Sequence, residues 1–383
     1  MESSKPVRSI GLRRLCVVVV VNVAVLVMCV GSLEIAARLW APEFTGDIHS
    51  PRLTRGRSYH RSEFAGQMIR VPAPGVTPEP RGAFFVVLGD SISNGYGMAY
   101  EDIYWVQLER LFRAASGEDV PRMVALSGNG STLADALKAL RALADVDSID
   151  VREVLYQFNF NDITPVDAAR LHEDPEATGV SRAGRAFARW RYQWLNHSTF
   201  LRLVQHHVGR LRWKRRGSCE ERGLEALGPY SWTFASRPVR TQAEALWRKF
   251  ESDLRETASL AHALHARFRL WLSPLLYDVD VDGLHPYYNP RAFDFSCATV
   301  DPRRRLSDMA DALGIEIIDP APALRASFER RVREGNMEPY FFTADDNHFT
   351  PPAARIVAEV LFKAYGTGAR ETWGGNKMEH SAE

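Results

Sequence analysis

Short apolar runs alternate with longer segments of helical spacing between residues 83 and 365. Each run is four or five residues long, which favours a buried strand. The predicted strands are 84–88, 123–126, 154–158, 268–272 and 315–318. The helices predicted between and after them are 102–115, an Ala/Leu-rich segment that ends near 144, 241–265, and a last helix after Thr350, with Pro351 in its first turn. This alternation predicts the α/β fold class, with a parallel sheet that helices cover on both faces.

The pattern breaks in two regions outside this alternation. Residues 34–80 contain six prolines and no sustained periodicity, so we interpret them as a linker. Residues 165–240 contain many arginines and four tryptophans, with helical pieces around 182–213, and we interpret them as an insertion. Residues 1–14 form a basic tail, residues 81–366 the main domain, and residues 367–383 a disordered tail.

The amino-terminal region contains an apolar segment, 15–33, without a charged residue. About 19 apolar residues can cross the hydrocarbon core of a membrane as a helix. Basic residues precede the segment, so the positive-inside rule predicts a cytoplasmic amino end and a periplasmic or extracellular main domain. A cleaved signal peptide is the alternative, although this segment is longer than the usual apolar region and lacks a clear cleavage site.

Composition and charge exclude few classes of protein. The chain has 383 residues, 45% hydrophobic and 25% charged, which is typical of a globular protein with a large core. A net charge of +1 gives no reason to expect a nucleic-acid partner. Of four cysteines, only Cys219 and Cys297 lie outside the apolar amino-terminal segment, and they either form a disulfide or remain two free thiols.

The best candidate for a nucleophile is Ser91. It follows the predicted strand 84–88 in the sequence Gly89-Asp90-Ser91 and therefore lies at the carboxyl end of a central strand, where open α/β sheets bind ligands. A serine there can perform acyl transfer if a base, a group that orients the base, and oxyanion donors surround it.

The candidate base is His348, which stands just before the last predicted helix. Asp345 lies three residues earlier and can fix the tautomer of the imidazole; Asp346 is the alternative, with a less suitable spacing. The backbone N–H groups of Ser91 and Gly128, together with the side chain of Asn161, are candidate donors for an oxyanion hole.

These residues occur in the order of the four sequence blocks of the SGNH (GDSL-type) hydrolases, which the chain resembles over residues 83–365 apart from the insertion. The blocks are Gly89-Asp90-Ser91, Gly128 in the loop after the second strand, Asn161-Asp162, and Asp345 with His348. The resemblance implies a three-layer α/β/α fold with a five-stranded parallel sheet, and cleavage or transfer of ester-linked acyl groups without a metal or cofactor. It assigns Ser91 as nucleophile, His348 as base, Asp345 as its partner, and Ser91, Gly128 and Asn161 to the oxyanion hole.

Two features depart from the family pattern. Asn159 occupies a position where the third block usually has glycine, and Gly130 competes with Gly128 for the oxyanion role. A second D-x-x-H sequence, at Asp282 and His285, follows the fourth strand directly and lacks the closing helix, so we prefer His348.

Each candidate also has a purely structural interpretation. Ser91 could cap a turn, His348 could be a surface histidine beside an acidic loop, and Asn161 could be a turn former. The insertion could be a helical lid, a surface that rests on the membrane, a groove for a polymer, or a packing element with a solvated basic face.

The sequence thus predicts a membrane-anchored serine esterase that acts through an acyl-serine intermediate on O-acylated envelope carbohydrate. The alternatives are an O-acyltransferase or lipase of the same fold, and a non-catalytic protein that binds polysaccharide or acts as an envelope scaffold. The expected partners are an ester substrate, a glycan or a lipid, and the membrane through the amino-terminal helix; no feature indicates an oligomeric state.

Overall fold

The computed structural model describes most of the chain. The described residues are 12–40, 60–76, 78–116, 120–164, 198–201, 203–204, 208, 217–222, 227–280, 295–336, 338, 340–341 and 348–366. Most of the predicted insertion, including its helical pieces up to residue 197, lies outside them.

The centre of the molecule is a five-stranded parallel sheet in the order β4-β3-β5-β6-β7. The strands are β3 (Gly82–Gly89), β4 (Arg122–Ser127), β5 (Ile149–Phe158), β6 (Arg267–Leu272) and β7 (Glu316–Ile318). All five predicted strands are therefore confirmed. The central strand β3 is buried on both faces over Phe84–Gly89. This order reverses direction between β3 and β5, and such switch points create a crevice at the carboxyl ends of the strands.

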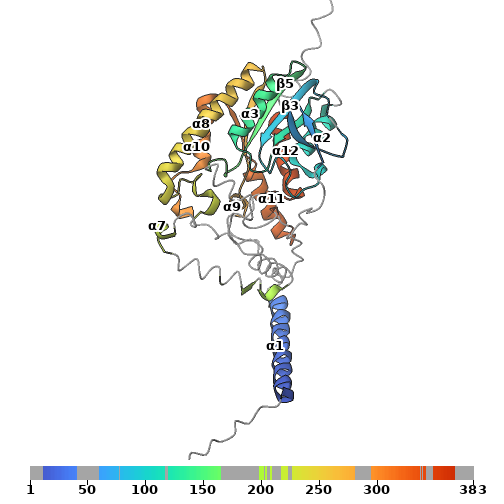
Figure 1. Cartoon of the computed structure of the whole chain (residues 1–383), viewed down its shortest axis with the longest axis vertical. Coiled ribbons are helices and arrows are strands. Elements are labelled where there is room, and N and C mark those ends of the chain that lie inside the picture. Colours follow the sequence, from blue (N-terminus) through green and yellow to red (C-terminus); the bar gives the residue numbers. More distant parts are fainter. Residues whose placement is uncertain are drawn as a thin grey trace, which may run out of the picture.

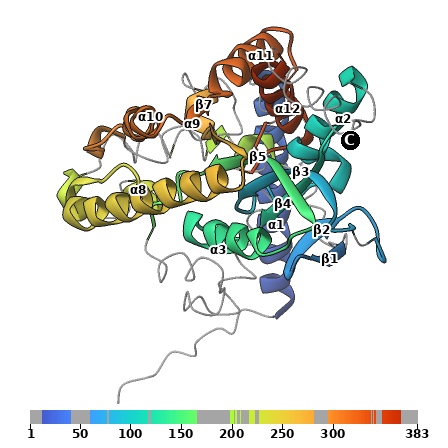
Figure 2. The same ribbon diagram turned by 90° about the horizontal axis from the view of Figure 1, so that it is seen from above.

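Helices cover both faces of the sheet and form three layers (Figure 2). One face packs against α3 (Leu133–Ala144), α8 (Arg240–Ala263) and α10 (Pro302–Leu313), and the other against α2 (Tyr104–Ser116), α11 (Ala321–Arg333) and α12 (Pro351–Gly366). Two buried hydrophobic clusters, one on each side of the sheet, result from this arrangement. The α/β/α fold predicted from the sequence is confirmed.

A hairpin lies in the region that the sequence predicts to be a linker. Strands β1 (His60–Phe64) and β2 (Gln67–Val71) pair antiparallel, and Ala65 and Gly66 both have positive φ in the connecting turn. The side chains of Phe64, Ile69 and Val71 are buried in the main core. The prolines of this region flank the hairpin, so an interpretation based on proline content does not detect its two strands.

The amino-terminal helix α1 (Leu12–Trp40) extends away from the domain (Figure 1). Its segment Val19–Trp40 is long and apolar enough to cross a membrane, and that property is shared by membrane anchors and signal sequences. In Figure 1, the short helix α9 (Leu276–Val279) and α11, which follow the carboxyl ends of β6 and β7, lie on the side of the domain nearer to α1. The carboxyl ends of the strands, called the carboxyl edge of the sheet below, therefore face that side. The opposite ends are called the amino edge.

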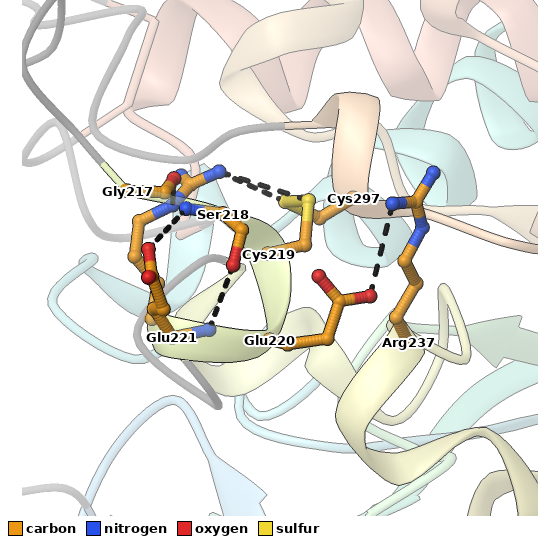
Figure 3. The surroundings of a disulfide bond; sticks show 8 residues. Gly217, Ser218, Cys219, Glu220, Glu221, Arg237 and Cys297 are labelled. Carbon is orange, nitrogen blue, oxygen red and sulfur yellow. Dashed lines mark hydrogen bonds and ion pairs between the residues drawn. A yellow bond between two sulfur atoms is a disulfide. The ribbon is translucent and has the colours of Figure 1, made fainter.

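A disulfide joins Cys219, in the short helix α7 (Cys219–Arg222), to Cys297, in the 3-10 helix η6 (Phe295–Cys297) (Figure 3). Of the two alternatives for this pair, the structure has the bridge. Both cysteines are buried, and Arg222 donates a hydrogen bond to the Cys297 sulfur (3.1 Å). The bond connects the end of the predicted insertion to the segment after β6, and disulfides of this kind persist in oxidising compartments.

Candidate functional site

Strand β3 delivers Ser91 to the carboxyl edge of the sheet through a tight turn. The side chain of Ser91 is 7% exposed. A Cβ atom on Gly89 would collide with Ser93 Oγ and lie 2.6 Å from Gln157 Oε1, so only glycine allows this approach of the backbone. The turn is closed by hydrogen bonds from Asn94 N to Asp90 O (2.9 Å) and from Tyr96 N to Ser91 O (2.9 Å).

The imidazole of His348 meets the hydroxyl of Ser91, although the two residues are 257 positions apart. The distance from His348 Nε2 to Ser91 Oγ is 2.6 Å. His348 stands three residues before α12 and is half-buried. The next residue, Phe349, is fully buried and forms a β-bridge with Phe341, which fixes the backbone beside the histidine. The structure therefore brings together a nucleophile and a base within hydrogen-bonding distance.

Four of the residues singled out from the sequence lie outside the described residues. They are Asp345 and its alternative Asp346, shortly before His348, and the competing pair Asp282 and His285. The role of Asp345 stays a prediction.

The candidate oxyanion donors lie on loops at the same edge of the sheet. Gly128 directly follows β4, and a Cβ atom there would lie 2.8 Å from Ser131 Oγ. The two loops are connected by a hydrogen bond from Asn94 Nδ2 to Asn129 Oδ1 (3.0 Å). This bond holds the loop of Gly128 against the turn of Ser91.

Asn161 follows β5 in the third loop at this edge. Its side-chain oxygen is buried and has no hydrogen-bond partner in the described part of the chain. A half-turn of the amide exchanges its oxygen with its N–H donors. Asn161 therefore has an amide oxygen without a partner in the described part of the chain, at the edge where Ser91 and His348 meet.

Beneath Ser91 lies a buried carboxylate, Asp90, which neutral donors surround. Asp90 Oδ1 accepts hydrogen bonds from Ile92 N (2.9 Å) and Gln157 Nε2 (3.0 Å), and Oδ2 accepts one from Asn159 Nδ2 (2.6 Å). Asn159 thus uses its side chain to hold Asp90. Since Asp90 precedes Ser91 and binds Ile92, this network fixes the backbone of the nucleophile.

A second part of the network connects the turn to α2 and β6. Ser93 Oγ donates to Gln157 Oε1 (2.6 Å) and lies 2.7 Å from Tyr104 Oη, to which Trp271 Nε1 donates (3.3 Å). All four side chains are buried, and burial raises the pKa of Tyr104 above its ordinary value. Tyr104 therefore stays a neutral hydroxyl that can share hydrogen bonds with its neighbours.

Asp162 closes the network at the end of β5. One of its oxygens accepts hydrogen bonds from Tyr156 Oη (2.7 Å) and from Asn159 N (2.8 Å). Burial, and then the nearby Asp90 carboxylate, raise the pKa of Asp162 well above its ordinary value. The negative charge of a neighbouring acid disfavours a second one, which agrees with the direction of the shift at Asp162.

Sequence reasoning missed two residues that support His348. The ring of Tyr96 packs against the imidazole, with 4.7 Å between the ring centroids. Arg70, on β2, donates to the carbonyl oxygens of Asn94 (2.8 Å), Gly95 (2.6 Å) and Met98 (2.6 Å), which flank Tyr96. Only the Asn/Gly-rich composition of residues 94–97 indicated that carbonyl groups would need donors here.

No group of three or more His, Cys, Asp or Glu side chains among the described residues could hold a metal ion.

No protein-family model and no curated protein matches the sequence. Solved structures with a similar fold include TesA, with 14% identity and a TM-score of 0.38 over 75% of this chain and 99% of that chain. The psychrotrophic esterase EstA from Pseudoalteromonas sp. has 12% identity and a TM-score of 0.36, over 75% and 98% of the two chains. The acetylxylan esterase Axe2 from Geobacillus stearothermophilus has 14% identity and a TM-score of 0.36, over 75% and 95%. At such identities and TM-scores, the likeness carries no argument about what this chain does.

Proposed function

We propose that the protein is a serine esterase of the SGNH type, in which Ser91 is the nucleophile and His348 the general base. The observation that carries this proposal is the contact of 2.6 Å between Ser91 Oγ and His348 Nε2 at the carboxyl edge of the sheet. A serine is activated when an adjacent imidazole can accept its proton.

The reaction begins when Ser91 Oγ attacks the carbonyl carbon of an ester while His348 Nε2 takes the hydroxyl proton. The N–H groups of Ser91 and Gly128 and the amide of Asn161 stabilise the oxyanion that forms. When the tetrahedral intermediate collapses, the C–O bond to the alcohol breaks, and His348 returns the proton to the leaving oxygen. Asp345 orients the imidazole and stabilises its charged form.

An acyl group is then bound to Ser91 Oγ. Water, activated by His348, attacks this ester and releases a carboxylic acid, which completes hydrolysis. A sugar hydroxyl in the place of water would give an O-acyltransferase with the same residues, because the two acceptors react through the same oxyanion.

The substrate class that we propose is O-acylated carbohydrate of the cell envelope. The apolar helix α1 supports an attachment to the membrane, and the bond between Cys219 and Cys297 supports an oxidising compartment outside the cytoplasm. Lipid esters are the alternative class of substrate, and a non-catalytic envelope protein is the alternative class of function.

The test is hydrolysis of p-nitrophenyl acetate by the full-length protein in detergent. We expect the S91A variant to lose activity by at least about a thousandfold, as expected for loss of a nucleophile. The matched control is S259A, since Ser259 is an exposed serine on α8 at the other side of the domain. Activity that survives in S91A would contradict the proposal, and a wild type without activity on several acyl esters would favour the non-catalytic alternative.

A further inference from the structure

The carboxyl-terminal turns of α1 contact another part of the chain, unlike the rest of the helix. From Val19 to Leu33 every described side chain is exposed, as expected for a helix that faces lipid. Glu34 is the first charged residue after this stretch, and its side chain is only 20% exposed. Ala37, one turn further, is 5% exposed. One face of the last turns of α1 is therefore packed against another part of the chain.

A carboxylate at this place is unfavourable unless it is bound. Partial burial at the edge of a membrane costs an ionised group its hydration. Arg38, one turn away, donates to Glu34 Oε1 (2.8 Å) but is itself largely exposed.

Three further donors reach Glu34 from a segment more than 160 residues away in the sequence. Ser198 Oγ donates to Glu34 Oε2 (2.8 Å), Thr199 N donates to Oε1 (3.0 Å), and Phe200 N donates to Oε2 (3.0 Å). Thr199 is 1% exposed, so this contact excludes water.

Two of these donors, Thr199 N and Phe200 N, are N–H groups at the start of a helical segment, which a helix leaves unsatisfied. Residues 199–201 are helical, and Ser198 Oγ also accepts a hydrogen bond from Leu201 N (3.1 Å). Glu34 and Ser198 together therefore cap this segment, and Glu34 accepts two of its backbone N–H donors. A negative charge is also favoured at the amino end of a helix.

We propose that α1 is a docking site for the segment that begins at Ser198, with Glu34 as the residue that binds it. The helix is then retained in the mature protein as part of the folded structure and is more than a tether. Removal of α1 as a signal peptide would leave the N–H groups of Thr199 and Phe200 without their acceptor. The contact lies on the side of the domain that carries the carboxyl edge of the sheet (Figure 1), and it does not depend on the proposed activity.

The experiment uses full-length protein in lipid nanodiscs, with Cys16 and Cys29 replaced by alanine. Glu34→Cys is combined with Ser198→Cys, and a bis-methanethiosulfonate reagent with a short spacer replaces the lost length of the glutamate. The matched control combines Ile35→Cys with Ser198→Cys, because Ile35 is 63% exposed on another face of α1. We expect about tenfold more cross-linked peptide from the pair of positions 34 and 198 than from the pair 35 and 198, since proximity sets the effective concentration. Equal yields from the two pairs would overturn the proposal.

Hydrogen exchange gives a second measurement without cysteines. In Glu34→Ala, the amides of Thr199 and Phe200 should exchange about tenfold faster or more, the factor expected when hydrogen bonds to a charged acceptor are lost. Ile35→Ala should leave them unchanged, and exchange in β3 should be the same in both variants if the domain stays folded. Unchanged exchange at Thr199 and Phe200 in Glu34→Ala would overturn the proposal, as would a mature wild-type protein whose intact mass lacks residues 1–40.

Discussion

The two edges of the central sheet each bury an acid but bind it in different ways. At the carboxyl edge, Asp90 is 1% exposed and accepts hydrogen bonds from neutral backbone and amide N–H groups. At the amino edge, Glu153, in β5, is 0% exposed and pairs with the guanidinium groups of Arg269 (3.2 Å) and Arg267 (3.4 Å).

The difference shows what each edge needs. The neutral N–H donors around Asp90 connect the nucleophile turn to β5 by hydrogen bonds and add no charge. The guanidinium groups at the amino edge also donate hydrogen bonds, but they add positive charge and connect β5 to β6 without any side chain of the candidate site. We therefore expect substitutions at the carboxyl edge to change activity most, and substitutions at the amino edge to change stability and its dependence on pH.

The largest difference in kcat should be seen when a histidine at each edge is replaced by alanine. His348→Ala removes the base and should lower kcat on p-nitrophenyl acetate by about a thousandfold or more. His262→Ala changes an exposed histidine near the end of α8, on the amino side of β6, and should leave kcat unchanged. Comparable losses in the two variants would remove the distinction between the edges.

A smaller loss of activity should follow from substitution of Arg70, which supports the site through hydrogen bonds to backbone carbonyl groups. Arg70→Ala frees the carbonyls of Asn94, Gly95 and Met98 and with them the loop that holds Tyr96 against His348. Because a displacement of about 1 Å can cost about a hundredfold, kcat should fall by up to that factor. Arg61, which is paired with Arg70 across the hairpin and exposed, provides the control. An Arg70→Ala variant with the kcat of Arg61→Ala would contradict a positioning role.

Asn159→Gly introduces the glycine that is usual at this position in the SGNH hydrolases, which the sequence resembles, and removes one donor from Asp90. We expect kcat to fall by about tenfold, since a hydrogen bond to the buried side chain of Asp90 is lost, while KM changes little. Steady-state kinetics measures both constants. A kcat at or above that of the wild type would mean that Asn159 is not needed to hold Asp90.

At the amino edge, substitution of Glu153 is expected to change the stability of the fold and not the activity. Burial outweighs the attraction of Arg269 and Arg267 and raises the pKa of Glu153 from 4.5 to about 7. The folded protein therefore binds this proton more tightly than the unfolded chain does. The resulting stabilisation is complete below pH 4.5 and is lost as the pH rises through 7.

Glu153→Gln isolates this effect because glutamine does not titrate. The free energy of unfolding of the wild type, relative to that of Glu153→Gln, should fall by up to about 3 kcal/mol between pH 5 and pH 8. Urea denaturation in detergent measures the difference at each pH. A difference that does not depend on pH would contradict the shifted pKa, and a lower kcat in the folded variant would contradict the separation of the two edges.

The sheet could be predicted from the sequence because its strands are short, mainly apolar runs that alternate with segments of helical spacing. Phe84–Leu88 is the clearest case, where the run is followed by turn residues that can only lie at a strand end. The meeting of Ser91 with His348 followed from the same rule, since parallel strands share one carboxyl edge.

The residues that support the site could not be predicted in this way. Gln157 and Ser93 lie inside or beside apolar runs, and nothing local indicates that their side chains bind each other. Arg70 stands in a hairpin of five-residue strands, too short for its alternation to stand out among the flanking prolines. Such contacts depend on the register of distant segments, which hydrophobic periodicity does not contain.

The most direct test of the account is covalent labelling of the full-length protein with a fluorophosphonate probe, followed by peptide mapping. The probe reacts with a serine only when a neighbouring base activates its hydroxyl. We expect one adduct in the wild type, on Ser91, and no adduct on this serine in His348→Ala. Labelling of another serine, or labelling of Ser91 that does not depend on His348, would contradict the assignment of nucleophile and base.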